Sequence, residues 1–217
     1  VVLGARRTGR IDALAAELGE PARAVTLDVT DKESVAGFCR SIEACDVLVN
    51  NAGGALGLEE IREADEENWL EMYQSNVLGT ARMTKGLLGK LVASGDGFVV
   101  NIGSVAGFEP YAGGAGYNAA KHAVRAVTDV LRIELLGQPV RVSEIDPGMV
   151  ETDFSLVRFS GDEERARAVY EGVVPLTAED IADCVVFVVT RPSHVDIDRL
   201  VVRPRDQARV HLLNRRS

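Results

Sequence analysis

The sequence predicts a three-layer α/β protein in which helices cover both faces of a doubly wound parallel β-sheet. Short runs of β-branched residues alternate with longer amphipathic stretches, which is typical of successive β-α units. The predicted strands are almost continuously apolar, as expected for strands that are buried on both faces. No internal repeat, low-complexity tract or linker interrupts the chain, so residues 1–217 are expected to form a single domain.

Each expected element has a local signal. The amphipathic spacing and the capping signals predict helices at 10–18, 30–42, 66–92, 116–136 and 181–189. Thr30 with Glu33, and Thr177 with Asp180, match the pattern of a capping box at a helix start. The apolar runs predict strands at 1–5, 23–29, 46–51, 98–102, 140–145 and 200–202.

The composition excludes several classes of protein. The apolar share is 46%, too high for a disordered chain. The net charge is −9, whereas nucleic-acid-binding proteins usually have a basic balance. No apolar run is long enough for a membrane span, and no signal peptide is visible. The cysteines are too few and too scattered for a disulfide framework or a metal site, so we expect small buried thiols in a cytoplasmic protein (Cys39, Cys45 and Cys184).

Ligands of parallel sheets bind at the carboxyl ends of the strands, so the residues that follow each strand are the first candidates for a site. A phenol and an ammonium group stand four residues apart at Tyr117 and Lys121, and on a helix they would share a face. A cation near a phenol favours the phenolate, which predicts a lowered pKa for Tyr117 and a role as general acid or base. The alternative interpretation is an ordinary pair on a helix surface.

Three further candidates surround this pair in the predicted topology. Ser104 follows the 98–102 strand and could polarise a carbonyl oxygen, although a serine here could equally be a turn or N-cap residue. Asn76 lies in a helical pattern that asparagine disfavours, which indicates a bend that holds a water or, alternatively, a solvent-facing side chain. Small residues at 50–53 could let the backbone approach a flat ligand or could form a plain turn.

In order and spacing, these residues resemble the short-chain dehydrogenase/reductase family from Val1 to about Leu213, including Asn50-Asn51-Ala52-Gly53, Asn76, Ser104, Tyr117, Lys121 and Pro147-Gly148. The resemblance implies a Rossmann-like sheet and a nicotinamide cofactor that supplies the hydride. It implies that Tyr117 is the acid/base and that Lys121 lowers its pKa and binds the nicotinamide ribose. It implies that Ser104 holds the carbonyl and that Asn76 supports a water in the proton relay.

The resemblance also indicates where the cofactor binds. It implies contacts from Asn50, Asn51, Ala52 and Gly53, from Tyr117 and Lys121, and from Pro147, Gly148, Val150 and Thr152. Asp28 and Val29 match the pair that contacts adenine. The sequence departs from the family pattern at its start, because Val1 aligns with the family's second strand. A first strand and helix, with their glycine-rich turn, are therefore expected upstream of this sequence. In the sheet, that strand would lie between the 1–5 and 46–51 strands.

The residues after the first strand favour NADP over NAD. A carboxylate at the end of this strand would bind the ribose 2′-hydroxyl of NAD, whereas arginine suits the 2′-phosphate of NADP. The position here is Ala5, followed by Arg6 and Arg7, which can engage a phosphate. The alternative is that both arginines are surface residues at a helix start.

Two stretches resemble one branch of the family, the NADP-dependent dehydrogenases of 3-hydroxy acids such as serine and L-allo-threonine. They are Asn101-Ile102-Gly103-Ser104 with Pro110-Tyr111-Ala112-Gly113-Gly114, and the segment 152–162. The carboxylate of such a substrate requires a cation, and Arg158 in the expected lid at 151–175 is the candidate beside Ser104 and Tyr117. A lid-surface arginine or a structural ion pair remains the alternative role for Arg158.

Two other functions remain open: a reductase of bulkier aldehydes or ketones, and a non-catalytic cofactor-binding regulator. The presence of all four tetrad residues speaks against the regulator. The two long predicted helices carry more apolar positions than one sheet face can cover. Together with the resemblance, this predicts a homodimer or homotetramer.

Overall fold

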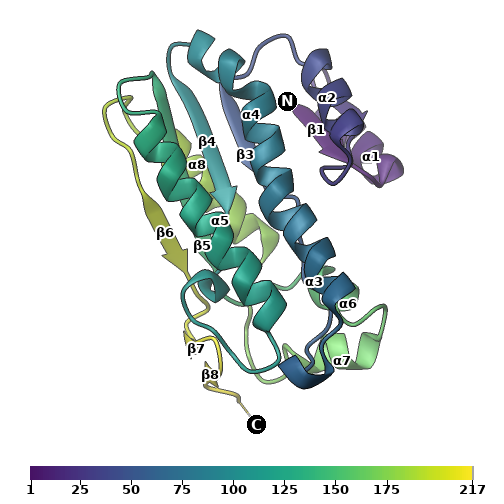
Figure 1. Ribbon diagram of the computed structural model, residues 1–217. Coiled ribbons are helices and arrows are strands. Elements are labelled where there is room, and N and C mark those ends of the chain that lie inside the picture. Colours follow the sequence, from purple (N-terminus) through teal and green to yellow (C-terminus); the bar gives the residue numbers. More distant parts are fainter. Residues whose placement is uncertain (217) are drawn as a thin grey trace.

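The computed structural model describes residues 1–216 and has the predicted α/β architecture (Figure 1). The helices are α1 (Thr8–Leu18), α2 (Lys32–Ser41), α3 (Glu66–Tyr73), α4 (Gly79–Ala93), α5 (Ala115–Glu134), α6 (Phe154–Arg158), α7 (Glu163–Ala168) and α8 (Ala178–Val189). The parallel strands are β1 (Val2–Ala5), β2 (Arg23–Thr26), β3 (Val47–Asn50), β4 (Gly97–Ile102), β5 (Val140–Pro147) and β6 (Arg199–Val202). A short antiparallel hairpin, β7 (Gln207–Arg209) and β8 (Leu212–Leu213), follows them.

The parallel strands form two separate ladders. One joins β1 and β2, with Val2 opposite Arg23, and the other has the order β3-β4-β5-β6. Within residues 1–216 no ladder connects β1 to β3, and this is the place where the family resemblance predicts a further strand. On β3, Val47 and Val49 are 44% and 41% exposed, unlike the fully buried valines of β4.

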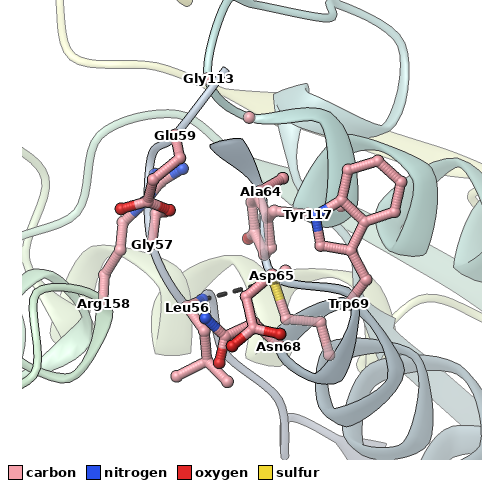
Figure 2. A pocket seen from close by; sticks show the side chains of 13 residues that line it. Leu56, Gly57, Glu59, Ala64, Asp65, Asn68, Trp69, Gly113, Tyr117 and Arg158 are labelled. Atoms are coloured by element: carbon pink, nitrogen blue, oxygen red, sulfur yellow. Dashed lines mark hydrogen bonds between the residues drawn. The ribbon is translucent and has the colours of Figure 1, made fainter. Parts of the chain in front are cut away.

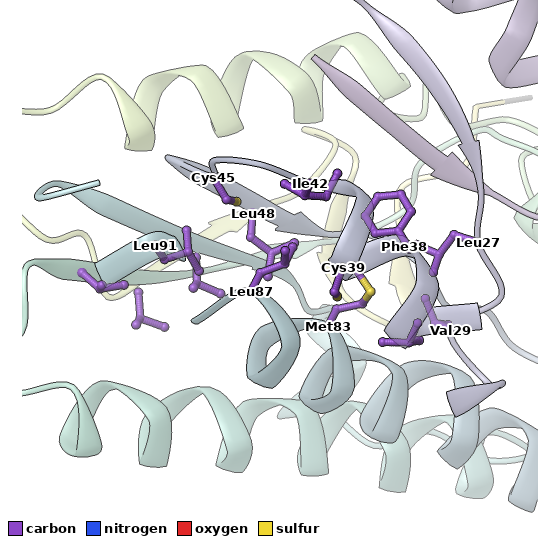
Figure 3. Packing of buried hydrophobic residues seen from close by; sticks show 14 of the residues in the cluster. Leu27, Val29, Phe38, Cys39, Ile42, Cys45, Leu48, Met83, Leu87 and Leu91 are labelled. Carbon is purple, nitrogen blue, oxygen red and sulfur yellow. The ribbon is translucent and has the colours of Figure 1, made fainter. Parts of the chain in front are cut away.

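A hydrophobic cluster packs the two ladders against each other (Figure 3). It combines Leu27 and Val29, which follow β2, with Phe38 of α2 and with Met83 and Leu87 of α4. Cys39 and Cys45 lie in this cluster as buried free thiols, and Cys184 is a half-buried free thiol. The cluster therefore holds the β1–β2 ladder against the larger sheet.

Polar side chains of α4 reinforce this packing. Arg82 donates from Nη1 to the carbonyl oxygens of Val29 and Thr30, at 3.1 Å each, and Lys90 Nζ donates to Cys39 O at 2.6 Å. Because all three acceptors lie in the segment after β2 or on α2, α4 connects the β1–β2 part to the larger sheet.

The larger sheet is covered on both faces. In Figure 1, α4 and α5 lie in front of it and α8 lies behind it. The α8 side is a second cluster in which Val188 packs with Phe98, Val100 and Ile145 from β4 and β5. Among the helices of residues 1–216, none is both long enough and apolar enough to span a membrane.

The start of α2 differs from the prediction. The N-cap is Asp31, whose side chain accepts the N–H of Glu33, so the expected box of Thr30 and Glu33 is wrong. Thr30 is instead bound to Asp28, to which it donates both its N–H and its hydroxyl. This turn also ends β2 at Thr26, earlier than the expected residue 29. The second predicted box, Thr177 with Asp180, is confirmed at the start of α8.

The long helix predicted at 66–92 is present in three parts. A π-helical turn, Gln74–Leu78, separates α3 from α4 and contains the buried Asn76. A π turn widens the backbone by one residue and is frequently found at functional sites. The sequence-based expectation of a bend at this asparagine is therefore confirmed, and the alternative of a solvent-facing side chain is wrong.

The C-terminal tail contacts two segments near the carboxyl ends of the strands. Glu109, in the loop that leads to α5, accepts hydrogen bonds from Arg203 Nη2 and Arg209 Nη1 at 2.7 Å each and from Val210 N at 3.1 Å. Arg215 donates to the carbonyl oxygens of Val169 and Glu171, just after α7. The tail is thus docked on the predicted lid as well as on the loop before α5.

Candidate active site

The four residues predicted to be catalytic converge above the carboxyl end of β4. Ser104 follows β4 directly, Tyr117 and Lys121 are one turn apart on α5, and the π turn of Asn76 packs against α5. Their exposed fractions are 9%, 8%, 8% and 1% in this order. Close packing and exclusion of water make this a place where charges and protons are strongly influenced by their neighbours.

Tyr117 and Lys121 face each other as the spacing predicts. Lys121 Nζ lies 5.8 Å from the centroid of the Tyr117 ring and donates to Ile102 O at 2.9 Å. Burial lowers the pKa of Lys121 to about 8. Burial raises the pKa of Tyr117, and this effect outweighs the opposing interactions with Ser104 and Arg158. The lowered pKa predicted from the sequence is therefore wrong for the protein alone, because desolvation of the phenolate exceeds the attraction of the nearby cations.

Ser104 has the N-cap role that the sequence offered as one alternative. Its hydroxyl caps the short helical turn Val105–Gly107 by accepting the N–H of Ala106 at 3.1 Å. This bond uses a lone pair of Oγ and leaves its proton available for a substrate oxygen. Its backbone N–H donates to Asp146 Oδ1 at 2.9 Å, which fixes the end of β4 against β5.

Asn76 connects the π turn to the loop after β3. Its Nδ2 donates to Gly54 O at 2.9 Å and to Met72 O at 2.8 Å, while its Oδ1 is buried and receives no hydrogen bond within residues 1–216. At Gly53, where φ is 155°, a Cβ would lie 2.4 Å from this same Oδ1. Glycine is therefore required where the loop meets Asn76.

The predicted cofactor residues of the 50–53 segment divide into two kinds. Asn50 is buried and donates to Thr84 Oγ1 at 3.0 Å and to Asn101 Oδ1 at 2.8 Å, so its side chain fixes the end of β3. Asn51, Ala52 and Gly53 are exposed. This leaves the backbone of the loop accessible at the sheet edge.

The candidate residues for the adenosine end lie together beyond β1 and β2. Arg6 and Arg7 are exposed, Val29 is buried, and Asp28 is half-buried with its pKa held below the usual range by hydrogen bonds from Thr30. Arg7 Nη1 lies 3.2 Å from Asp153 Oδ2. This carboxylate comes from the segment after β5 and also pairs with Arg10, an arrangement that sequence spacing did not indicate.

The segment after β5 is built around its glycine. A Cβ at Gly148 would lie 2.1 Å from Gln207 Oε1, and its N–H donates to Val202 O at 2.7 Å. Pro147 is the last residue of β5, and Val150 forms a bridge with Leu176. Thr152 is exposed and its hydroxyl accepts the N–H of Phe154. These four predicted cofactor residues therefore form a braced loop between the sheet and α6.

Tyr117 and Arg158 share a pocket with about 260 Å³ of empty volume, including its opening (Figure 2). Arg158 donates from Nε to Gly57 O and from Nη2 to Tyr111 OH, at 2.9 Å each. Its Cζ lies 5.8 Å from the Tyr117 ring centroid. Within residues 1–216 Arg158 forms no salt bridge, so the alternative of a structural ion pair is not supported there.

Sequence reasoning missed several residues of this region. Tyr111 binds Arg158 across 47 residues of sequence, and no local pattern announces such a pair. Trp69 of α3 and Glu59 line the same pocket. Glu144 and Asp146 are buried beneath the site, and here a signal was present, because acids in an otherwise apolar strand require a partner.

Comparison with known proteins agrees with this geometry. The family model for short chain dehydrogenases matches residues 1–162. An uncharacterized oxidoreductase of Mycobacterium tuberculosis (strain H37Rv) is 56% identical over 208 residues, which are 96% of this chain and 82% of the relative. The NADP-dependent 3-hydroxy acid dehydrogenase YdfG of Salmonella typhi is 43% identical over 222 residues, covering 100% of this chain and 90% of the relative.

Among solved structures, the closed form of a serine dehydrogenase complexed with NADP+ superposes with a TM-score of 0.94 at 40% identity, covering 100% of this chain and 90% of that one. A serine dehydrogenase from Escherichia coli has a TM-score of 0.82 at 36% identity, covering 96% and 88% of the two chains. The resemblance noted in the sequence is thus supported over the whole chain, which belongs to the short chain dehydrogenase family of oxidoreductases.

Proposed function

We propose that this protein is an NADP-dependent dehydrogenase of small 3-hydroxy acids. The observation that carries the proposal is the position of Arg158, a half-buried cation without a carboxylate partner in residues 1–216, in the same pocket as Tyr117. A half-buried cation with no carboxylate partner favours an anionic ligand. The 3-hydroxy acid and serine dehydrogenases among the relatives are named for substrates that carry a carboxylate, which supports the assignment.

The walls of the pocket favour the small substrate over the bulkier aldehyde or ketone. Trp69 and Met72 of α3 and Leu56 restrict it on the apolar side. A substrate of a few carbon atoms with a carboxylate at one end is compatible with these walls.

The residues at the sheet edge fit NADP. The exposed Arg6 and Arg7 at the end of β1 suit a 2′-phosphate, and the exposed backbone of Asn51–Gly53 allows close approach of a flat group. The orphaned Asn76 Oδ1 lies beside this backbone and is free to accept a hydrogen bond, as a proton relay through water requires. When bound there, a nicotinamide cofactor would supply the hydride acceptor for alcohol oxidation.

The side chains of this chain have separate tasks. Ser104 donates its free hydroxyl proton to the substrate oxygen, and Tyr117 takes the proton of the substrate alcohol during oxidation or returns it during reduction. Lys121 supplies positive charge 5.8 Å from the phenol ring, which favours the phenolate. Arg158 anchors the substrate carboxylate, and Tyr111 OH fixes the direction of its guanidinium.

The test replaces Arg158 and compares an acid with its ester. Arg158→Gln should reduce kcat/KM for 3-hydroxybutyrate by about 2–4 kcal/mol in transition-state free energy, the scale of losing the partner of a buried charge. Activity on methyl 3-hydroxybutyrate should change little, because the ester has no charge to pair. The wild type should prefer the acid.

A matched control lies on the same lid. Arg165 Cζ lies 4.4 Å from the centroid of the Phe159 ring, and Arg165 does not line the pocket. Arg165→Gln should therefore leave the ratio of kcat/KM for the acid to kcat/KM for the ester unchanged. Equal loss on both substrates in Arg158→Gln would assign Arg158 a structural role in the lid. A wild type that prefers the ester or a bulky ketone would refute the proposed substrate class.

We also propose that the chain forms a homodimer or homotetramer. Leu70 of α3 and Val130 and Ile133 of α5 are large apolar residues, yet they are 65%, 50% and 73% exposed. Apolar side chains exposed on these helices suit an interface with another subunit. Light scattering should give a dimer or larger particle at micromolar concentration, and a monomer there would contradict this assembly.

A further inference from the structure

Two acidic side chains of β5 are buried directly beneath the reaction centre. Glu144 and Asp146 are 1% and 0% exposed, and residues two apart in a strand point to the same face. Helix α5, which carries Tyr117 and Lys121, packs against β5. The reaction described above uses neither carboxyl group, yet burying an ionised carboxylate is costly unless it is paired.

Asp146 holds the backbone of Ser104. Its Oδ1 accepts the Ser104 N–H at 2.9 Å, and its Oδ2 lies 3.2 Å from Arg199 Nε. Gly103 shows that both acids meet at this point. A Cβ on Gly103 would lie 2.1 Å from Asp146 Oδ1 and 2.8 Å from Glu144 Oε1, so the two carboxyl groups rest on the backbone that leads into Ser104.

Glu144 lacks a donor. Neither of its carboxyl oxygens receives a hydrogen bond within the described part of the chain. The nearest hydroxyl, that of Thr128, donates to Val124 O at 2.8 Å, and it lowers the pKa of Glu144 by less than burial and Asp146 raise it. An ionised Glu144 would therefore lie beside a second buried carboxylate with too little hydrogen bonding to offset its burial, whereas one proton between the two acids would supply a donor.

We propose that Glu144 and Asp146 share one proton at neutral pH, and that this carboxylic acid–carboxylate pair positions Ser104 through its backbone N–H. Both are positioning residues, because neither contacts the substrate. The importance of the pair for catalysis rests on the proposed role of Ser104. Burial, together with the neighbouring Asp146, raises the pKa of Glu144 to about 8, and burial also raises that of Asp146.

The charged groups that face the pair come from two elements. Lys121 approaches from α5 and Arg199 from β6, and Asp129 of α5 lies 3.7 Å from Arg199 Nη2. The two cations stabilise the single negative charge that remains when one proton is shared. Loss of that proton at higher pH would place two carboxylates side by side at Gly103, next to the residue that holds the substrate oxygen.

Infrared difference spectroscopy tests the shared proton directly. In a spectrum of wild type minus Glu144→Gln at pH 7, the carbonyl stretch of a protonated carboxyl group should appear, and it should fade as the pH rises through about 8. Glu144→Gln retains the shape and supplies an amide donor to Asp146, so the fold is preserved. The absence of this band at pH 7 would mean that both acids are ionised and would overturn the proposal.

Kinetics test the positioning. Asp146→Leu should lower kcat by about 10–100-fold, the scale of misplacing a reacting group by about 1 Å, while the Kd for NADP+ stays within about two-fold. Asp146→Asn retains an oxygen acceptor for the Ser104 N–H and should recover most of the loss. Equal losses in the two variants, or a parallel rise of Kd, would overturn the positioning role.

If Asp146→Leu does not fold, Asp146→Asn and the infrared measurement still test the proposal. A large fall in kcat for Asp146→Asn would refute positioning of Ser104 through the oxygen acceptor. Ser104→Ala separates this proposal from the function on which it rests. Full turnover in Ser104→Ala would refute the role of the hydroxyl in the proposed reaction. It would not alter the infrared band of the carboxyl pair.

Discussion

Replacing Lys121 with methionine should move the pH dependence of alcohol oxidation upward. Lys121 Nζ lies 5.8 Å from the centroid of the Tyr117 ring, and both side chains are buried. At a separation of about 6 Å and an effective dielectric constant of about 20, two unit charges interact by about 3 kcal/mol, or about two pKa units. Lys121→Met should therefore raise the pKa of Tyr117 by up to about two units, and it should slow oxidation at pH 7 by up to about 100-fold.

The size of the effect depends on the charge of the lysine. Because burial lowers the pKa of Lys121 to about 8, the ammonium is fully charged, and its benefit complete, only well below pH 8. Above pH 8 the wild type loses this charge and should approach the variant. The assay is the pH profile of kcat/KM for oxidation of the hydroxy acid, with Lys121→Arg as the control that retains a cation.

Two outcomes would refute this reasoning. A profile of Lys121→Met that runs parallel to that of the wild type at every pH would show that Lys121 does not act on the phenol. A rise in KM for NADP+ with an unchanged midpoint of the pH profile of kcat/KM would assign Lys121 to cofactor binding alone. A thermal melt checks that losing the hydrogen bond to Ile102 O has not unfolded α5.

Tyr117→Phe should lower the rate by about 10²–10⁴ through loss of the general acid/base while NADPH binding, followed by fluorescence titration, is retained; near-full turnover with a rate-limiting chemical step would exclude Tyr117 from that role. Arg6→Ala with Arg7→Ala should weaken NADPH more than NADH, and equal losses in a binding titration would mean that the arginines serve the fold. Burial opposes ionisation of Glu109, but hydrogen bonds from Arg209 and Val210 outweigh it and lower the pKa of Glu109. The ionised side chain therefore stabilises the fold above the pKa that Glu109 has in the unfolded chain. This stabilisation is lost as the pH falls through the lower pKa of the folded state. Glu109→Gln should therefore cost about 1–3 kcal/mol of unfolding free energy at pH 7, and a difference that persists in strong acid would contradict this origin.

The alternation of strands and helices was predictable because it depends on local apolar periodicity. The start of α2 was not, since Thr30 and Asp31 are both good N-cap residues and Asp28 decides between them by binding Thr30. In the sequence, the interruption of the long helix was indicated only by Asn76, a residue type that disfavours a helix interior. Its π geometry depends on the contact with Gly54, 22 residues earlier.

The candidate site was predictable to the extent that motifs fix it. Tyr117, Lys121 and Ser104 come together because α5 packs against the helical turn Val105–Gly107, which Ser104 caps. The direction of the Tyr117 pKa could not be predicted, because it depends on burial by segments far away in sequence, such as Phe154 at 5.5 Å between ring centroids. The partnership of Arg158 with Tyr111 is equally non-local.

The contacts of α4 have a consequence for cofactor choice. Arg82 and Lys90 of α4 donate to backbone oxygens of Val29, Thr30 and Cys39, beside the β1–β2 ladder that carries Arg6 and Arg7. Loss of the Arg82 side chain should loosen this part of the protein, because it leaves two carbonyl oxygens without their donor. Discrimination between the two nicotinamide cofactors would then fall while the geometry around Lys121 persists.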